Sequence, residues 1–525
     1  MHPTFRRSLA SLLAITLAAP ALPLHAAEPA VKGPESVADW YDSGQQFIRD
    51  AKQVLPNVRR AKNIILFVGD GMGVSTITAA RILEGQMKGG PGEENSLAFE
   101  RFPHVALSKT YSWDQQTSDS APTMTAIVTG YKAREGQLSV NHTTARGECS
   151  ADVTASKALP TILEQAAAAG KSTGVVSTAR LTHATPGATY AHISVRDWES
   201  DRDIHQYETA NGLPERSCTV KDIAAQLIDV SPVVRSSLKV AMGGGRIHFY
   251  PNAMNDPERS APGARLDGRH LANEWVSTRG GPSRAAYVWN KAGFDAIDPA
   301  KTEHLLGLFE NSHMQYEVDR AKDRSGEPSL TEMTEKSIRM LARNPAGFFL
   351  HVEGGRIDHA HHAGNAKRAL LDTIEFSNAI RKAVAMTDPR DTLIIVTADH
   401  SHVFTISGYP HRGNDILGLV KDVPHVDGHP TAPLKDNLGI PYTTLGYQNG
   451  PGWRDAIGTG RSRPDLATID TRETGYLQEA AIPLPSETHG GEDVAIFATG
   501  PKAYLVHGVM EQHWIYHVMR EAFGF

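Results

Sequence analysis

The chain is poor in features that mark several protein classes. Among its 525 residues are only two cysteines, Cys149 and Cys218, and their spacing matches no zinc-binding CxxC pattern. Positive charge is not in excess: 53 Lys and Arg face 59 Asp and Glu, which argues against a nucleic-acid binder. Beyond the N-terminus no run reaches the ~18 apolar residues of a membrane span, so none is predicted. With 40% hydrophobic and 21% charged residues, the composition is typical of a soluble globular protein.

The N-terminus has the layout of a secretory signal. Two arginines, Arg6 and Arg7, precede the apolar stretch 9–22, and small residues follow at 26 and 27. This order is typical of a cleaved signal peptide, which we assign to residues 1–26, and it predicts a periplasmic or secreted protein. The arginine pair also fits twin-arginine export. A buried N-terminal helix is the alternative.

The two cysteines fit an exported protein. In an oxidising compartment Cys149 and Cys218 can pair, and closing this loop would stabilise the fold by roughly 3–5 kcal/mol in the chain-entropy model. Two unrelated buried thiols are the alternative at this point.

Short apolar runs without polar alternation predict buried parallel strands, and helical patterns separate them. The expected strands are 63–68, 173–177, 240–242, 347–352, 392–397 and 494–498. The expected helices are 75–86, 121–129, 161–169, 331–342, 366–386 and 511–522. This order predicts an α/β fold, a three-layer sandwich with a largely parallel central sheet. Ligands of such folds bind at the carboxyl edge of the sheet, so functional motifs should directly follow strands.

Residues 404–470 depart from this alternation. They are rich in Gly, Pro, Asp and Asn and contain few periodic apolar residues. We expect an irregular insertion on the rim of a catalytic domain that covers residues 27–525, not an independent fold.

Acidic side chains follow two of the expected strands. Asp70 lies in a glycine-rich stretch that leaves room for a cation, although Gly-Asp-Gly alone is also a common turn. Asp358 and His362 are four residues apart, so on a helical turn they face the same way and can share a zinc ion. Glu353 adds a hard oxygen ligand suited to a magnesium-like ion. A His-rich surface loop is the alternative.

Two further motifs complete a predicted metal centre. Asp399 and His400 follow the strand 392–397 and supply an oxygen and an imidazole, the ordinary ligands of zinc. His489 directly precedes the strand 494–498. Together the motifs supply too many ligands for one metal, and they predict two zinc ions and one magnesium ion.

Ser120 is the candidate nucleophile. It opens a helical segment whose first turn contains Pro122, where the missing N–H of proline is harmless. At a helix N-terminus the backbone N–H groups favour anions, as a serine that accepts phosphate requires. A plain helix N-cap is the alternative for Ser120.

Taken together, these motifs resemble the alkaline phosphatase family over about residues 60–520. The motifs are Asp70-Gly-Met-Gly73, Asp119-Ser120-Ala121, His183-Ala-Thr185-Pro186, Glu353-Gly-Gly-Arg-Ile-Asp358-His359, Thr397-Ala-Asp399-His400-Ser-His402 and Glu487-Thr-His489-Gly-Gly-Glu-Asp493. The chain looks closer to animal-type than to enterobacterial-type members, because His183 and His359 stand where the latter have Asp and Lys. Pro122 departs from the family, which has a small residue there, so we expect an altered contact near the nucleophile.

The resemblance implies a role for each site residue. The zinc ligands would be Asp358, His362 and His489 for one ion and Asp70, Asp399 and His400 for the other. Asp70 would bridge to magnesium, with Thr185 and Glu353 as further ligands and His183 and His402 in the surrounding shell. Arg196 would grip the phosphoryl oxygens. A calcium site of animal-type members would comprise Glu258, the Phe309 carbonyl, Glu310 and Glu327, and Cys149 and Cys218 match a disulfide of that branch.

The implied function is an exported, metal-dependent phosphomonoesterase that cleaves many phosphate monoesters through a phosphoserine. A homodimer is implied as well. Activity should rise toward alkaline pH and be lost with chelators. Three alternatives stay open: a phosphodiesterase, a sulfatase, and a non-catalytic exported protein that binds metal or phosphate. Residues 120–124 match the C/S-x-P-x-R motif of sulfatases except that Met124 stands in place of the arginine.

Overall fold

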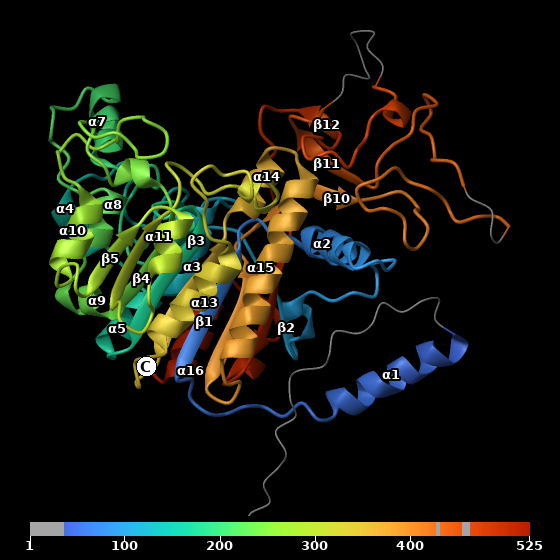
Figure 1. Cartoon of the computed structure of the whole chain (residues 1–525), viewed down its shortest axis with the longest axis horizontal. Coiled ribbons are helices and arrows are strands. Elements are labelled where there is room, and N and C mark those ends of the chain that lie inside the picture. Colours follow the sequence, from blue (N-terminus) through green and yellow to red (C-terminus); the bar gives the residue numbers. More distant parts are fainter. Residues whose placement is uncertain (1–35, 427–430, 454–462) are drawn as a thin grey trace, which may run out of the picture.

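The computed structural model describes residues 36–426, 431–453 and 463–525, and the predicted signal peptide, residues 1–26, lies outside them. Ten strands form one central sheet, and helices cover both of its faces (Figure 1). This confirms the α/β sandwich predicted from the sequence. Within the described part of the chain, no helix combines the length and the apolar character needed to cross a bilayer.

The central sheet has the strand order β15-β2-β14-β8-β1-β7-β3-β4-β6-β5. Its strands are β1 Asn63–Gly69, β2 His104–Lys109, β3 Ser172–Arg180, β4 Leu238–Gly244, β5 Ala285–Val288, β6 His304–Leu308, β7 Phe348–Gly354, β8 Thr392–Ala398, β14 Val494–Thr499 and β15 Gly508–Glu511. All six predicted strands are present, but β14, which was predicted to be parallel like the others, is antiparallel to its neighbours. The additional strands β2, β5, β6 and β15 lie toward the two sides of the sheet, and the apolar run of β2, residues 105–107, is too short to mark a strand in the sequence.

One strand runs against all the others. β14 pairs antiparallel with β8 and with β2, whereas the other pairings of this sheet are parallel. The amino end of β14 therefore lies at the edge where the parallel strands have their carboxyl ends. This explains how His489, which precedes a strand, reaches the edge that Asp70 and Asp399 reach by following one.

The central strands are buried on both faces, which is why they are continuous apolar runs. In β1, Ile64, Leu66 and Val68 join one apolar cluster, and Ile65 and Phe67 join the other. Helices α3 Ser120–Thr129, α5 Ile162–Ala168 and α16 Trp514–Phe523 cover the first cluster, and α2 Val74–Met87, α13 Leu330–Leu341 and α15 Ala366–Met386 cover the second. The other α-helices that follow β1 in the described residues are α4 Ala151–Ser156, α6 Ala184–Gly187, α7 Asp201–Ala210, α8 Ile223–Ile228, α9 Pro232–Ser237, α10 Leu271–Thr278, α11 Lys291–Ala296, α12 Glu317–Arg320 and α14 Arg356–His362.

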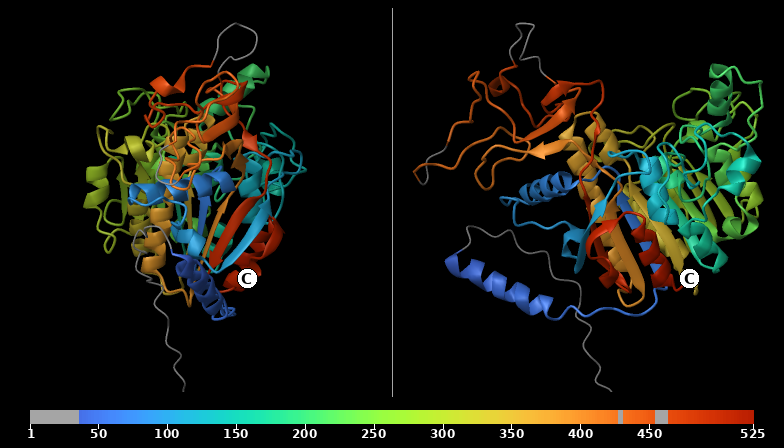
Figure 2. Two further views of the ribbon diagram at one scale, coloured as in Figure 1. Left: turned by 90° about the vertical axis from the view of Figure 1, so that its right-hand side faces the viewer. Right: turned by 180° about the vertical axis from the view of Figure 1, so that it is seen from behind.

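The rim insertion is more regular and longer than the predicted range 404–470. It contains a three-stranded sheet of β10 Phe404–Ile406, β11 Leu445–Gly450 and β12 Ala480–Pro483. In two views at right angles this sheet projects beyond the central layers (Figure 2). Its final strand lies past residue 470, where the mixed composition gave no boundary signal. A two-stranded pairing of β9 Ser401–His402 with β13 His489–Gly490 joins this region to the sheet edge.

Helix α1, Val37–Ala51, stands apart from the rest of the chain (Figures 1 and 2). None of its residues is buried, although Trp40, Tyr41 and Phe47 are large apolar side chains. A capping box at Ser36 and Asp39 fixes its start.

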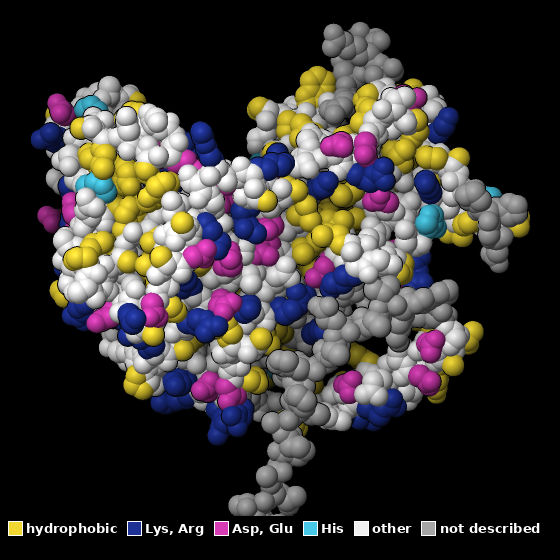
Figure 3. Space-filling view, in the orientation of Figure 1, with side chains coloured by type: hydrophobic (Ala, Val, Ile, Leu, Met, Phe, Trp, Pro, Cys, Tyr) yellow, Lys and Arg dark blue, Asp and Glu magenta, His cyan; other side chains and the backbone are white. Residues whose placement is uncertain are grey.

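On the face drawn in Figure 3, Lys and Arg side chains are interspersed with Asp and Glu and form no continuous basic area.

Candidate active site and metal centre

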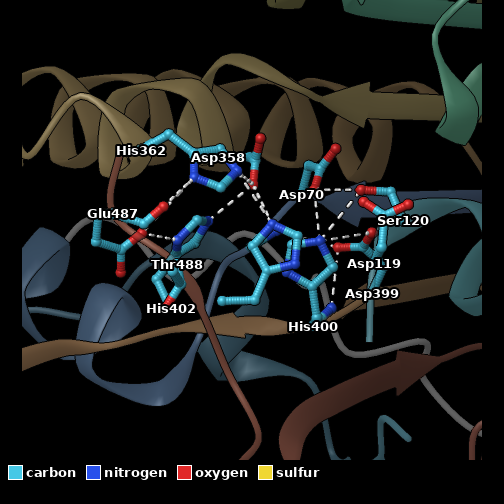
Figure 4. A network of polar contacts seen from close by, with 12 residues as sticks. Asp70, Asp119, Ser120, Asp358, His362, Asp399, His400, His402, Glu487 and Thr488 are labelled. Atoms are coloured by element: carbon cyan, nitrogen blue, oxygen red, sulfur yellow. Dashed lines mark hydrogen bonds and ion pairs between the residues drawn. The ribbon is translucent and has the colours of Figure 1, made fainter. Parts of the chain in front are cut away.

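The predicted site residues converge at the carboxyl edge of the central sheet (Figure 4). Asp70 follows β1, Asp399 follows β8, and Asp358 lies in α14 directly after β7. Parallel strands bring their carboxyl ends to one edge, so residues as far apart in the chain as Ser120 and His400, 280 positions, meet there. All four predicted motif clusters belong to this one site.

Ser120 is the first residue of α3, and Asp119 is its N-cap. The alternative that Ser120 is a plain N-cap is therefore wrong, and its hydroxyl is available to the site. The Ser120 Oγ lies 3.3 Å from Asp70 Oδ1 and 3.1 Å from His400 Nε2. Pro122 is buried in the first turn of α3, where its missing N–H interrupts no helical bond.

The first metal-binding group surrounds the serine. Carboxylate and imidazole atoms of Asp70, Asp399 and His400 lie within 4.8 Å of one another. The N–H of Gly71 donates to Asp399 Oδ1 over 3.1 Å, and Thr123 Oγ1 donates to its Oδ2 over 3.4 Å, which fixes this carboxylate. The group matches one predicted zinc set, and Ser120 is placed at its border.

The second group is built on α14. The Oδ1 atom of Asp358 lies 3.3 Å from His362 Nε2 and 3.4 Å from His489 Nε2. The opposite ring nitrogens are held by backbone carbonyls: His362 Nδ1 donates to Glu487 O over 2.6 Å, and His489 Nδ1 to Ser118 O over 2.8 Å. These bonds leave both Nε2 lone pairs directed into the site, the arrangement in which histidine binds a metal.

His402 bridges two carboxylates in this group. Its Nδ1 lies 2.5 Å from Glu487 Oε2 and its Nε2 lies 2.8 Å from Asp358 Oδ1. Burial lowers the pKa of His402, but the charges of Glu487 and Asp358 outweigh burial and raise the pKa to about 10. His402 thus contacts Asp358 and Glu487 at once, and its place in the surrounding shell stays a prediction.

A third group lies on the other side of Asp70. Ligand atoms of Asp70, His183 and Glu353 lie within 4.8 Å of one another, and Thr185 Oγ1 donates to Asp70 Oδ2 over 3.4 Å. Ser177 Oγ donates to one oxygen of Glu353, while the other, Oε1, is buried without a hydrogen-bond partner. An orphaned buried carboxylate oxygen at this point fits a cation.

The site concentrates negative charge in a buried place. Burial, followed by the charges of Asp399 and Asp358, raises the pKa of Asp70 well above its ordinary value. Burial raises the pKa of Glu353 to about 8 and that of Asp399 to about 6, and neighbouring carboxylates add to both shifts. Among the described residues, none of these three carboxylates forms an ion pair with Lys or Arg. Bound cations would supply the missing positive charge.

Arg196 reaches the site from the side of Asp119. Its Nη1 donates to Asp119 Oδ1 over 2.5 Å and Oδ2 over 2.6 Å, and its Nη2 lies 2.8 Å from His183 Nε2. Burial pushes the pKa of Asp119 up, but the Arg196 charge outweighs it and leaves the pKa lowered. The guanidinium is thus held by Asp119, the residue that directly precedes Ser120.

The predicted calcium residues lie around a separate group of carboxylates, which shares no member with the three groups above. The carboxylates of Glu258, Glu310 and Asp323 lie within 4.8 Å of one another, a set we call the remote cluster. Phe309 is fully buried directly before Glu310. Glu327 is outside this set, but its Oε1 accepts the N–H of Gln315, whose side chain donates to Glu310. Burial raises the pKa of Asp323 to about 6 and that of Glu327 to about 9, with like charges adding to both.

Some functional contacts escaped sequence reasoning. Asp323 belongs to the remote cluster, but no sequence motif includes it. Its position in an irregular loop gave no signal of this role. Glu487 was quoted within a motif, but its contact with His402 depends on the β9–β13 pairing. Cys149 and Cys218 form a disulfide, which decides between pairing and separate thiols.

Comparison with known proteins places these observations in one family. The family model described as alkaline phosphatase matches residues 61–525. An alkaline phosphatase of Gadus morhua is 46% identical over 488 residues, covering 92% of this chain and 96% of the relative. The tissue-nonspecific isozyme of Homo sapiens is 45% identical over 489 residues, covering 92% and 88%. These relatives confirm the predicted likeness to animal-type members.

Solved structures share the fold at lower identity. Alkaline phosphatase from Thermus thermophilus aligns with a TM-score of 0.60 and 23% identity, covering 89% of this chain and 92% of that chain. Alkaline phosphatase from the Antarctic bacterium TAB5 aligns with a TM-score of 0.57 and 21% identity, covering 89% and 99%. A variant of the TAB5 enzyme was solved with Mg bound in a site called M3.

Proposed function

The chain belongs to the alkaline phosphatase family, and from this premise we propose that it cleaves phosphate monoesters through a covalent phosphoserine on Ser120. It is a metal-dependent phosphomonoesterase, as its relatives are. The single observation that carries the proposed route is the Ser120 hydroxyl, which lies between Asp70 and His400 at the start of α3. No other described serine combines a helix N-terminus with two members of a metal-binding group.

We assign two zinc ions and one magnesium ion to the three groups of the site. Imidazole and carboxylate donors are the zinc ligands of proteins, and the first two groups supply both. The third group offers mostly oxygen, which magnesium prefers, and its Glu353 oxygen lacks any partner. The magnesium in the TAB5 variant supports this choice by likeness of fold. Bound there, the metals would neutralise phosphoryl charge and favour the ionised serine and the leaving oxygen.

The residues of the chain then divide the reaction among them. Ser120 Oγ attacks phosphorus in line, and the bond from phosphorus to the alcohol oxygen breaks, leaving phosphate on the serine. Arg196 presents a planar fork that can hold two phosphoryl oxygens, once its nitrogens are shared between Asp119 and substrate. Water then attacks from the opposite side and restores the Ser120 hydroxyl. Asp119 keeps Arg196 oriented throughout.

A calcium ion at the remote cluster is the further cofactor that we propose. Asp323 Oδ2 and Glu327 Oε2 are buried there without hydrogen-bond partners, so the donor set fits a hard cation. Glu258, Glu310 and the Phe309 carbonyl remain its predicted ligands. The ion would take no part in the reaction, because the cluster shares no residue with the groups around Ser120.

We also propose a homodimer, whose second copy covers apolar surface that this chain leaves exposed. Trp40 and Phe47 of α1 are 58% and 69% exposed, and Val105 and Val509 of the neighbouring strands β2 and β15 are about half exposed. Such surface favours burial against a partner. Light scattering should give a dimer mass for the chain and a smaller mass after Trp40→Ser with Phe47→Ser. A monomeric chain would refute this.

Export of the protein through residues 1–26 stays part of the proposal. The Cys149–Cys218 disulfide supports it, because such bonds persist in oxidising compartments. Sequencing the N-terminus of protein recovered outside the cytoplasm tests it, and an intact Met1 would contradict it.

The activity itself is tested with a chromogenic phosphate monoester in alkaline buffer, with the matching diester and sulfate ester beside it. We expect rapid monoester turnover and at most slow turnover of the other two. Dominant sulfatase activity is not expected, because Met124 stands where sulfatases require an arginine. Dominant diester or sulfate turnover would overturn the assignment.

A further inference from the structure

The remote cluster differs from the active site in having arginine partners. Arg246 is completely buried and donates to Asp256 and, over 2.6 Å, to Glu258. It also donates to the carbonyl of Leu308, so its side chain is fixed on several sides. Because the Arg246 side chain is fixed in this way, we expect it to stay paired with Glu258 whether or not an ion is bound.

Arg259 is placed differently. Its side chain is 55% exposed, yet its Nε and Nη2 reach both oxygens of Glu310 over 3.0–3.2 Å. Glu310 itself is only 1% exposed. Among the described residues, Arg259 is the one charged partner of Glu310. Its other donors are neutral, the N–H of Asn311 and the side chain of Gln315.

The cluster opens to solvent on the side of Arg259. A cavity of ≈ 510 Å³ is lined by the three carboxylates of the cluster and by Arg259, and its lining also includes the cationic side chains of Lys322, Arg324, Arg356 and Arg368. Asp323 Oδ2 is buried without a hydrogen-bond partner, so part of the negative charge is left without a neighbour. A cation from solvent would enter where the Arg259 side chain now lies.

We propose that Arg259 is a built-in competitor of calcium at the remote cluster, holding Glu310 in the absence of the ion and leaving it when the ion binds. The inference rests on the calcium site proposed above and says what sets its affinity. A half-exposed arginine can swing into water at small cost, whereas the buried Arg246 cannot. Calcium must therefore displace one charged partner before Glu310 becomes a ligand.

The consequence is a weak but tunable site. With Arg259 in place, the loops around Glu310 stay neutralised without calcium, so the fold depends little on the ion. Without Arg259, Glu310 and Asp323 lie close together and neither has a cationic partner in the cluster. The surrounding loops should then need calcium to stay ordered. Affinity for calcium should rise by at least about tenfold when the competing charge is removed.

The test compares the Arg259→Gln variant with wild type and with Arg324→Gln as the matched control. Arg324 lines the same cavity and is exposed, but no ion pair joins it to the cluster. Each protein is kept loaded with zinc and magnesium, exchanged into calcium-free buffer and titrated with calcium by isothermal calorimetry. Thermal unfolding with and without calcium gives a second readout, and monoesterase activity is recorded in parallel.

We expect Arg259→Gln to bind calcium at least tenfold more tightly and to gain more thermal stability from it, while Arg324→Gln stays within about twofold of wild type. Equal calcium affinity in all three proteins would overturn the competition and leave the calcium site standing. An equal gain in calcium affinity in both variants would show that the overall charge of the protein, and not the Arg259–Glu310 pair, sets the affinity. That result would also overturn the competition. Absence of calcium binding in every protein would refute the site and the competitor together, whereas retained monoesterase activity would leave the catalytic proposal intact.

Discussion

Two acidic clusters of this protein differ in what balances their negative charge. At the active site, Asp70, Glu353 and Asp399 are completely buried and have no Lys or Arg partner among the described residues. At the remote cluster, Glu258 and Glu310 are paired with Arg246 and Arg259. The contrast indicates that the active site needs bound cations, whereas the remote cluster carries much of its own counter-charge.

The difference follows from what each place must do. Fixed arginines around Asp70 would occupy the space that a phosphoryl group needs. In our account, metals and Arg196 supply the positive charge at the active site instead. The remote cluster only has to keep loops in place, and an arginine serves that purpose without a metal. Each prediction below probes one side of this comparison.

The largest effect should come from the nucleophile. Ser120→Ala removes the group that accepts phosphate, and turnover should fall roughly 10⁴–10⁶-fold, as for other covalent nucleophiles. Ser118→Ala is the matched control, because only the backbone carbonyl of Ser118 contacts the metal site, through His489. Steady-state kinetics with a monoester measures both. Comparable activity of the two variants would exclude Ser120 as the nucleophile.

Metal removal should abolish activity and make stability depend on pH. In the metal-free protein the pKa values of Glu353 and Asp399, about 8 and about 6, lie above their unfolded values. The folded state then binds more protons than the unfolded state, so stability is lost as pH rises from about 4 to about 8. Melting temperatures across this range should fall in the metal-free protein and change little in the loaded one. Equal pH profiles would show that the carboxylates do not need cations.

Arg196 should matter next. Arg196→Ala deletes the fork beside Ser120, and kcat/KM should fall by roughly 10²–10³, as for other groups that stabilise transition-state charge. Arg146→Ala, at an exposed pair with Asp114 in the neighbouring loop, is the control and should change kcat/KM less than about twofold. A loss in Arg146→Ala as large as in Arg196→Ala would mean that general loop charge, not the fork, is responsible.

The remote cluster offers the sharpest comparison of its two arginines. Arg246→Gln leaves Asp256 and Glu258 buried without their partner and should cost about 3–5 kcal/mol of unfolding free energy. Arg259→Gln leaves the buried Glu310 with only its two neutral donors and should cost about 1–3 kcal/mol without calcium. Denaturant unfolding in calcium-free buffer measures both. The reverse order would contradict the assignment of a fixed and a displaceable arginine.

Much of this architecture could be predicted from the sequence because the central strands are buried on both faces. Their apolar runs marked β1, β7 and β8, and the acidic residues behind them marked the catalytic edge. Strand β2 could not be recognised, because its apolar run, residues 105–107, has only three residues between the polar His104 and Ser108. The direction of β14 was also beyond periodicity, since it is buried on both faces and is therefore an apolar run although it is antiparallel.

The site was predicted as far as its residues lie in motifs, and less well where loops bring them together. Asp358 and His362 followed from helical spacing, and α14 confirms that both lie on one helix. The contact of His402 with Glu487 depends on a two-residue pairing that no periodicity signals. Asp323 joins the remote cluster through an irregular loop, and for such loops the sequence offers no register.

The central claim, a covalent phosphoserine on Ser120, is tested most directly by trapping the intermediate. The loaded enzyme is mixed with a phosphate monoester, quenched in acid during turnover and mapped by peptide mass spectrometry. The account predicts one phosphate on the peptide that contains Ser120, and none in Ser120→Ala treated alike. Rapid turnover with no phosphate on that peptide, or with phosphate on another residue, would contradict it.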